Sequence, residues 1–184
     1  MTTTKTLSTW TIADGLPIIT SLGPYTNEAN RLAATQNAQA VNFSAVDVGR
    51  IAQQSDTGAM WVIESVTSGV PRWRLLAGPA PISAQSGTSY TLVTADMDHK
   101  IILTNGSAIA LTIPLSGSGF PIKAGDSVRI KQGGAGAVTV AGASGVTPHA
   151  SGTLVTGGQY SELVLECEFA NGIADVWAVF GRST

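Results

Sequence analysis

The sequence predicts an all-β protein, and three observations support this prediction. Apolar and polar residues alternate along short segments such as Val128–Lys131, where Val128 and Ile130 share one face. Glycine is common, with 21 residues, and serine and threonine recur throughout, as expected for short strands and tight turns. Strand-like segments come at short, regular spacing in the second half of the chain, which is typical of sandwiches and barrels. We therefore expect a small N-terminal β-meander with an extended arm, followed by a C-terminal antiparallel β-sandwich or barrel-like domain.

Residues 1–78 are expected to hold the arm and the meander, and to serve attachment and assembly. Met1–Ser8 is polar and rich in threonine, and Asn27–Ala40 has a helix-compatible composition, so we allow one short helix there. Three strands would follow in chain order: Val48–Gln54, Ala59–Val66 and Arg72–Ala77. Asp56-Thr57 would form the first turn with Gly58 in the left-handed conformation, and Ser68-Gly69 would form the second.

Residues 79–88 are rich in proline, glycine and serine and are expected to form a linker. The C-terminal domain, residues 89–184, would then project from the N-terminal region. Turn signals divide it into eight predicted strands: Tyr90–Thr94, Lys100–Thr104, Ala108–Pro114, Ser127–Gln132, Ala137–Val140, Thr153–Thr156, Tyr160–Phe169 and Ile173–Phe180.

Gly133–Gly136 is expected to close a hairpin between two of these strands. A three- or five-residue turn with a glycine at positive φ sets Ile130 against Val138 and keeps one apolar face. The same reasoning favours an odd-length loop, Asn105–Ser107, between the two strands before it.

The last hairpin is expected to close with a two-residue type I′ turn at Asn171-Gly172. In this register the apolar residues pair on one face: Leu163 with Phe180, Leu165 with Ala178 and Cys167 with Val176.

Charged residues make up 12% of the chain, about half of the roughly 25% typical of soluble domains. So little charge indicates that copies of the chain cover part of one another's surface, and we expect a homo-oligomer. The net charge of −2 gives no basic footprint, so nucleic acid is not an expected partner.

Cys167 is the single cysteine, which excludes an intrachain disulfide and a multi-cysteine metal site. The N-terminal sequence MTTTKTLSTW has no long apolar run, so we expect neither a signal peptide nor a membrane span. The chain would therefore be made in a cytoplasm.

Asp96, Asp98 and His99 are the nearest approach to a reactive cluster. A metal or acid–base role needs these groups to converge with a further ligand or a nucleophile. Consecutive residues of a turn point in different directions, so we interpret Asp96–His99 as a solvated β-turn. We expect no catalytic, cofactor-binding or metal-binding residues.

Glu166, Glu168 and Asp175 form a second acidic group, on the last hairpin. In the predicted register Glu168 lies opposite Asp175, which is destabilising. Calcium, hydration, or Arg129 or Lys131 of a neighbouring copy could offset these charges. Hydration or a subunit contact is favoured, because Ca²⁺ takes 6–8 oxygen ligands.

Other candidate groups have simpler interpretations. His149 is interpreted as a surface residue and Cys167 as a small core hydrophobe. Trp61 and Trp73 could stack on sugars, but a place in a core or a subunit interface is the better interpretation. Gly133–Gly136 is not a phosphate loop, since no Gly-Lys-Ser/Thr follows it.

Several short motifs follow one another along the chain. From residue 89 onward they are Ser89-Tyr90-Thr91-Leu92, Ala95-Asp96, Leu111-Thr112-Ile113-Pro114, Gly125-Asp126-Ser127-Val128, Gln132–Val140, Gly145-Val146, Gly158-Gln159-Tyr160 and Val176–Gly181. In this order they resemble a small β domain of tail-fibre and other virion-surface proteins of tailed bacteriophages. The stretch Val48–Leu76, with Gly49-Arg50-Ile51 and Trp61-Val62, looks like a hairpin unit that precedes such domains.

The resemblance implies a non-enzymatic structural protein of the virion, a short trimeric tail fibre or spike involved in host adsorption. Its N-terminal half would contact other virion proteins, and the loops Gly117–Phe120 and Ala143–Gly152 would recognise a host glycan or protein. A capsid decoration protein, as a head fibre or cement, is an alternative. A hydrolase of surface polysaccharide is a further alternative, which would need paired carboxylates in a groove.

Overall fold

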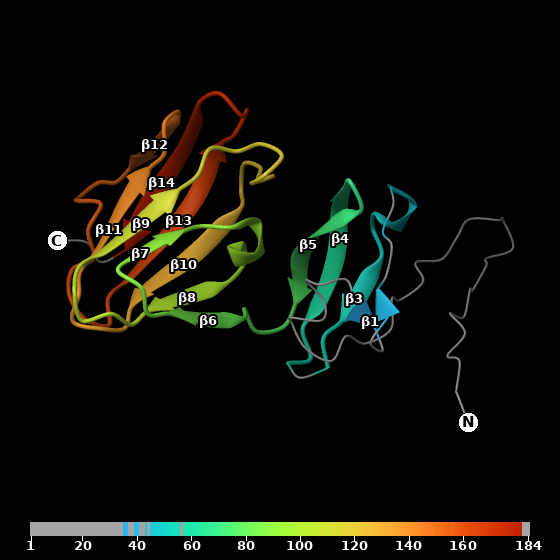
Figure 1. The fold of residues 1–184 in the computed structure, drawn as a ribbon, viewed down its shortest axis with the longest axis horizontal. Helices are drawn as coiled ribbons and strands as arrows, with labels where there is room; N and C mark the ends of the chain where they lie inside the picture. The colour runs from blue at the N-terminus through green and yellow to red at the C-terminus, as the bar shows by residue number, and fades with distance from the viewer. Residues whose placement is uncertain (1–34, 37–38, 41–42, 44, 56, 182–184) are drawn as a thin grey trace, which may run out of the picture. The chain divides into compact units, whose positions relative to one another are not determined.

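The computed structural model describes residues 35–36, 39–40, 43, 45–55 and 57–181. Their regular structure is nearly all β, which confirms the predicted fold class at that level (Figure 1). The chain divides into two compact units, unit 1 (Met1–Pro79) and unit 2 (Ala80–Thr184).

Unit 1 contains a three-stranded antiparallel sheet with the order β3-β4-β5. Its strands are β3 (Ile51–Gln53), β4 (Met60–Thr67) and β5 (Val70–Ala77). One face is buried against Phe43, whose ring meets that of Trp73 edge-on with 5.9 Å between centroids. Trp61 and Ile63 lie two residues apart on β4 and both face this small core, as strand alternation requires.

The turns of unit 1 follow the sequence prediction where the structure describes them. Gly58 has a φ of +71° before β4. Ser68 and Gly69 have φ values of 51° and 80° and join β4 to β5 as a two-residue type I′ turn. Asp56, the other residue expected to direct the first turn, lies outside the described residues.

The short helix expected in Asn27–Ala40 is wrong for the four residues of this segment that the structure describes. Thr35–Gln36 (β1) and Gln39–Ala40 (β2) pair as a small antiparallel ribbon. The rest of the segment, like the arm Met1–Ser8, lies outside the described residues. A single 3₁₀ turn, η1 (Ala45–Asp47), precedes β3.

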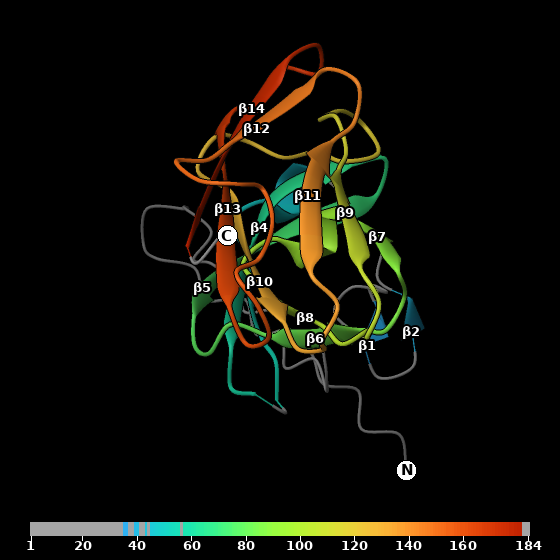
Figure 2. The same ribbon diagram turned by 90° about the vertical axis from the view of Figure 1, so that its left-hand side faces the viewer.

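Unit 2 has two sheets whose inner faces share one hydrophobic core (Figures 1 and 2). The larger sheet has the order β12-β14-β13-β10-β8-β6 and the smaller has the order β11-β9-β7. The strands are β6 (Ile82–Gln85), β7 (Ser89–Thr91), β8 (Lys100–Leu103), β9 (Ile109–Ile113), β10 (Ser127–Gln132), β11 (Val138–Gly142), β12 (Val146–His149), β13 (Glu162–Phe169) and β14 (Asp175–Gly181).

The strands from β6 to β11 alternate between the two sheets, so the expectation of antiparallel pairing is wrong for most pairs of unit 2. The chain passes from β6 to β7, from β8 to β9 and from β10 to β11, each time from the larger sheet to the smaller. As a result β6, β8 and β10 run parallel in one sheet, and β7, β9 and β11 run parallel in the other. The three connections stack as β-arches, and only the pairs of β13 with β10 and β14 are antiparallel among the ladders of unit 2.

The hairpin predicted at Gly133–Gly136 is one of these arches. Ile130 and Val138 are both fully buried in the same core, but they belong to different sheets. Gly134 and Gly136 lie against the preceding arch, where a Cβ atom would overlap the carbonyl groups of Asn105 and Ser107. The glycines therefore permit the close stacking of two backbones, and no residue of this segment has the positive φ we expected.

The loop Asn105–Ser107 is also an arch and not a hairpin turn. The Asn105 side chain donates to the carbonyl of Ser86 (2.6 Å) in the arch before it and accepts from the backbone N–H of Ser107 (2.8 Å). Gly136 donates its backbone N–H to the carbonyl of Asn105 (3.1 Å). Asn105 thus links all three arches.

The last predicted hairpin is confirmed, but its register is wrong. Leu165 pairs with Val179 and Cys167 with Trp177, after which a bulge at Glu168 shifts the ladder. Trp177 is therefore fully buried, whereas Phe180 is 47% exposed. The five residues between the strands are organised by Asn171, whose side chain accepts from the N–H groups of Ile173 and Ala174 (2.9 and 2.8 Å).

Two strands of the structure lie where the sequence predicted a linker and a loop. Ile82–Gln85 pairs with β8, so the segment 79–88 is in part a strand of the larger sheet and not a linker. Val146–His149 pairs with β14 at the opposite edge. Of the predicted strand Thr153–Thr156, Val155 makes a single bridge to Thr139.

Candidate interaction surface

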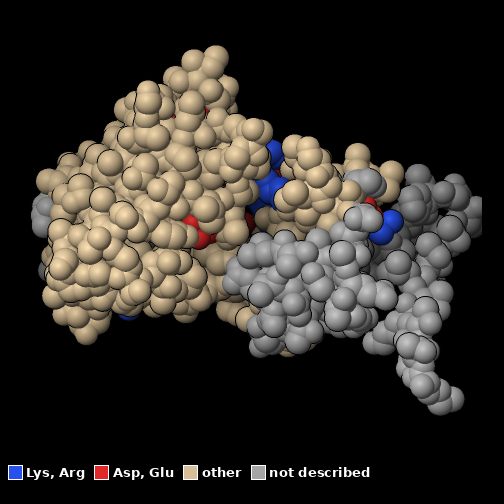
Figure 3. Space-filling model, viewed as in Figure 1, with Lys and Arg blue, Asp and Glu red and all other residues tan. Residues whose placement is uncertain are grey.

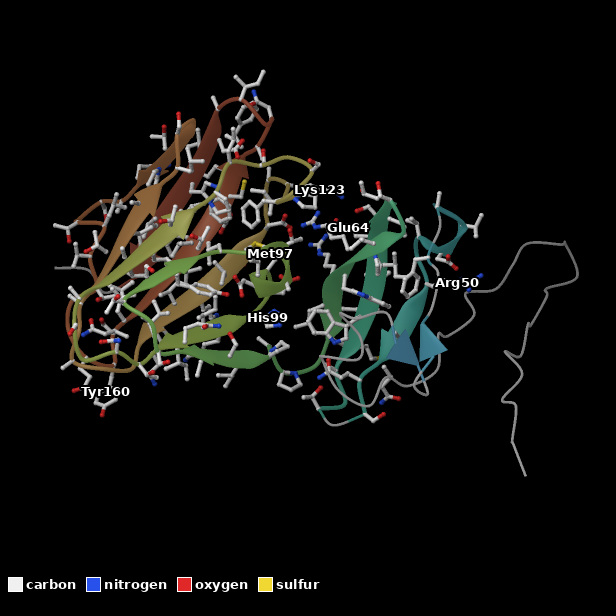
Figure 4. All side chains as sticks on the ribbon, in the orientation of Figure 1. Arg50, Glu64, Met97, His99, Lys123 and Tyr160 are labelled. Atoms are coloured by element: carbon white, nitrogen blue, oxygen red, sulfur yellow. The ribbon has the colours of Figure 1, made fainter. Side chains whose placement is uncertain are left out.

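Asp96–His99 is not the solvated turn that we expected. Asp96, Met97 and His99 are buried, and the segment continues from a 3₁₀ turn, η2 (Thr94–Asp96), between β7 and β8 (Figure 4). Asp96 accepts hydrogen bonds from the backbone N–H of Val93 (2.8 Å) and from the hydroxyl of Tyr90 (3.0 Å).

His99 turns to a different partner, since its Nδ1 lies 2.8 Å from the carbonyl oxygen of Met97. Each group therefore has a structural contact of its own, and the acid and the imidazole do not converge on a common point.

Tyr90 shows the effect of this arrangement on titration. Burial, the charge of Asp96 and the hydrogen bond to Asp96 all raise the pKa of Tyr90 above its ordinary value. A tyrosine held in its neutral form serves as a hydrogen-bond donor to Asp96. The pair fixes the path of the chain after β7.

Glu166, Glu168 and Asp175 lie in three separate environments. Glu166 is exposed on the outer face of the larger sheet, between Ser127 and Ala178. Glu168 lies in the bulge, and its Oε2 is 2.6 Å from Nε2 of His149 on β12. Asp175 points into the interior and is 1% exposed, so the predicted opposition of Glu168 and Asp175 is wrong.

Asp175 is held by the loop that follows β9. Its carboxylate accepts from the backbone N–H of Ser116 (2.6 Å), from the Ser116 hydroxyl (2.9 Å) and from the N–H of Asn171 (3.0 Å). Burial alone favours the neutral acid, but the hydrogen bonds from Ser116, Asn171 and Gly172 outweigh it and lower the pKa of Asp175. This carboxylate stabilises the fold and is not open to a cation.

The other candidate residues fall where the simpler interpretations put them. Cys167 is fully buried and His149 lies on the opposite face of the larger sheet, so the two do not form a nucleophile pair. Trp61 and Trp73 belong to the core of unit 1, which favours the core interpretation over sugar stacking. Among residues 35–181, within the described ranges, no three His, Cys, Asp or Glu side chains gather as a metal site.

Two surfaces of unit 2 are candidates for interaction, the outer face of the larger sheet and the edge formed by β6 and β7, and they differ in charge. The outer face of the larger sheet carries an ion pair between Lys100 and Glu162 (2.6 Å). It also carries Lys131, whose ammonium lies 5.8 Å from the centroid of the exposed Tyr160 ring. This face is polar and partly self-neutralised.

The second surface is the edge formed by β6 and β7, and it carries no charge. Between Arg74 and Asp96 the sequence contains no Asp, Glu, Lys or Arg. Ile82 is 64% exposed on β6, and Ala84, Ser89 and Thr91 are exposed as well. Charged groups are also sparse on the face of unit 2 in Figure 3. This uncharged edge is the candidate interaction surface of the chain.

Sequence reasoning missed this surface because residues 79–88 were interpreted as a linker. The available signal was the long interval without charge between Arg74 and Asp96. A solvated linker has no reason to avoid charged residues.

Comparison with known proteins adds no relative: no protein-family model and no curated protein matches the chain. Within the described residues, no helix has the length and apolar character needed to cross a membrane.

Proposed function

We propose that the chain is a non-enzymatic structural protein on the surface of a tailed-bacteriophage particle, a short fibre or spike built from several copies. In this proposal unit 1 is a β-meander that attaches the protein to the particle. Unit 2 is a β-sandwich that projects outward and takes part in host adsorption.

The observation that carries the proposal is that three buried groups of unit 2, Asp96, His99 and Asp175, make their contacts inside its own fold. Asp96 accepts a hydrogen bond from the Tyr90 hydroxyl and Asp175 accepts one from the Ser116 hydroxyl, while His99 lies at hydrogen-bond distance from the Met97 carbonyl. A hydrolase of polysaccharide needs two carboxylates facing each other across a groove. The buried Asp175 and the exposed Glu166 and Glu168 do not form such a pair.

The low charge content supports assembly. With 12% charged residues, an isolated copy leaves exposed apolar side chains such as Ile82, Ile173 and Phe180 in water. The order of short motifs that resembles virion-surface domains supplies the biological setting.

Antibodies against unit 2 test the proposal on intact particles of the bacteriophage that encodes the chain. Labelling of the tail is the expected result. Labelling of the head would favour the capsid decoration protein instead, and absence of label from purified particles would contradict both.

A second assay addresses the absence of catalysis. The pure protein should leave host surface polysaccharide intact. Glycan cleavage that is lost on Glu166→Gln substitution would overturn the non-enzymatic assignment.

A further inference from the structure

We infer that the edge formed by β6 and β7 joins two copies of this chain by β-strand addition, around a two-fold axis. The inference rests on the oligomeric assembly in the proposed function and names the surface that produces it.

The backbone of β6 has hydrogen-bonding groups that point away from its sheet. On the side that faces β8, the backbone N–H of Lys100 donates to the carbonyl of Pro81 (2.8 Å), and the backbone N–H of Thr104 donates to the carbonyl of Gln85 (2.9 Å). Because successive residues of a strand alternate in direction, Ser83 also faces β8, and the N–H and C=O groups of Ile82 and Ala84 point outward.

β7 has the same arrangement in the smaller sheet. Ala110 donates to the carbonyl of Thr88 (2.9 Å), and Leu92 donates to that of Thr112 (3.0 Å). Ser89 and Thr91 therefore direct their backbone groups away from β9. The two open strands follow each other through a three-residue arch, so both edges lie at the same end of the arch stack.

The other two edges of unit 2 are protected. On β11, Val140 donates to the carbonyl of Leu154 (2.7 Å) and Thr156 donates to that of Val138 (3.0 Å), so a further segment covers this strand. On β12, the backbone N–H of Asp175 donates to the carbonyl of Gly145 (2.8 Å), so Gly145 faces β14. Because successive residues of a strand alternate in direction, the backbone of Pro148 faces outward. Proline has no N–H to offer an incoming strand.

Charge, proline and a bulge are three of the devices with which soluble proteins protect an edge strand. β6 and β7 contain none of the three. Among the described residues no strand pairs with the outer edge of β6 or β7, so this is the edge where a partner strand is expected.

The geometry of the edge indicates the partner. One extended peptide would pair with β6 or with β7 and leave the other open. A second copy offers two open edges with the same separation between layers, and rotation about an axis normal to both sheets pairs β6 with β6 and β7 with β7. The absence of charge on this edge removes the like-charge repulsion that such symmetric pairing would otherwise bring.

A contact of this kind joins two copies, in place of the three that the resemblance implies. A closed trimer needs two different surfaces that meet head to tail. The two edges that could meet β6 and β7 in that way are the protected ones.

The test uses the full-length protein and measures its mass in solution together with amide hydrogen exchange. A dimer is expected, in which the amides of Ile82, Ala84, Ser89 and Thr91 become at least ten-fold more protected as concentration rises above the dimer dissociation constant. The double variant Ala84→Lys and Thr91→Lys should be monomeric, because each lysine is exposed on an edge strand and brings like charges together.

Ala110→Lys is the matched control, since it places the same charge on an exposed alanine of the central strand β9. It should remain a dimer. If the double variant fails to fold, the concentration dependence of amide exchange in the unmodified protein still tests whether the β6–β7 edge forms the contact.

A trimer in which the four amides exchange freely would overturn the edge contact and leave the assembly proposal standing. A monomer at every concentration would overturn both.

Discussion

Unit 1 and unit 2 are both built from β-strands, yet most of their strands are connected in different ways. In the three-stranded sheet of unit 1 each strand pairs with the next one along the chain, β3 with β4 and β4 with β5. In unit 2 the chain leaves the sheet after β6, β8 and β10 and enters the other sheet. The comparison teaches that a turn signal between two strands does not say whether those strands will pair.

The largest expected effect concerns the separate cores of the two units. Trp177 is fully buried in unit 2 and stacks on Phe120 with 6.5 Å between ring centroids. Trp177→Ala should lower the stability of unit 2 by about 3–5 kcal/mol, because it leaves a large cavity.

Hydrogen exchange resolved by strand is the measurement, with Trp61→Ala as the reciprocal variant in unit 1. Protection should fall in β13 for Trp177→Ala and in β4 for Trp61→Ala. An equal loss of hydrogen-exchange protection in both units from either variant would contradict the prediction that the two cores are independent.

The next effect distinguishes an arch from a hairpin turn. Gly136→Ala places a methyl group against the backbone of Ser107 and should cost about 1–3 kcal/mol or more. Gly106 lies in the neighbouring arch, where an added methyl group would meet nothing within 4 Å, so Gly106→Ala should change stability by less than about 0.5 kcal/mol. Denaturant titration measures both, and similar values would mean that the arches do not stack.

The carboxylate of Asp175 should make unit 2 more sensitive to acid than unit 1. Its pKa is lowered in the folded state, so its contribution is complete above the pKa of the unfolded chain and is lost as pH falls through the folded pKa. Ser116→Ala should cost about 1–3 kcal/mol at neutral pH.

The measurement is the stability of each unit from pH 7 down to about pH 2, well below the ordinary pKa of an aspartate carboxyl. The difference between Ser116→Ala and the unmodified protein should shrink below about pH 4. A difference that stays constant over this range would contradict the role of the charge.

The smallest effect lies in the tight turn of unit 1. Ser68 adopts a positive φ, where asparagine is better tolerated, so Ser68→Asn should stabilise unit 1 by about 0.5 kcal/mol. Thermal unfolding measures the gain, and hydrogen exchange in β13 should be unchanged. A loss of stability would mean that the turn is not of type I′.

Side-chain alternation was enough to predict which residues are buried between Val128 and Val140. Val128, Ile130, Val138 and Val140 face one core, as their spacing indicates. The connection could not be predicted, because two facing sheets and one paired hairpin both turn apolar side chains inward.

Register failed at the last hairpin for a related reason. A two-residue turn satisfied the apolar pattern, but a longer connection forms in which Asp175 accepts from the backbone N–H groups of Asn171 and of Ser116, which lies far away in the sequence. The largest side chain, that of Trp177, then faces the core. The candidate surface depended on recognising Ile82–Gln85 as a strand, and its prolines and serines gave the opposite indication.

The stacked arches have a consequence for how such a chain can change in length. Ile101 pairs with Ile130 and Ile109 pairs with Val138, an offset of 29 residues in both sheets, whereas the preceding pairs, Ile82 with Lys100 and Ser89 with Ala110, have offsets of 18 and 21 residues. The offset is therefore equal in the two sheets at one step of the stack and differs between them at the other. The length of chain between stacked strands can thus change from one arch to the next while both sheets remain paired.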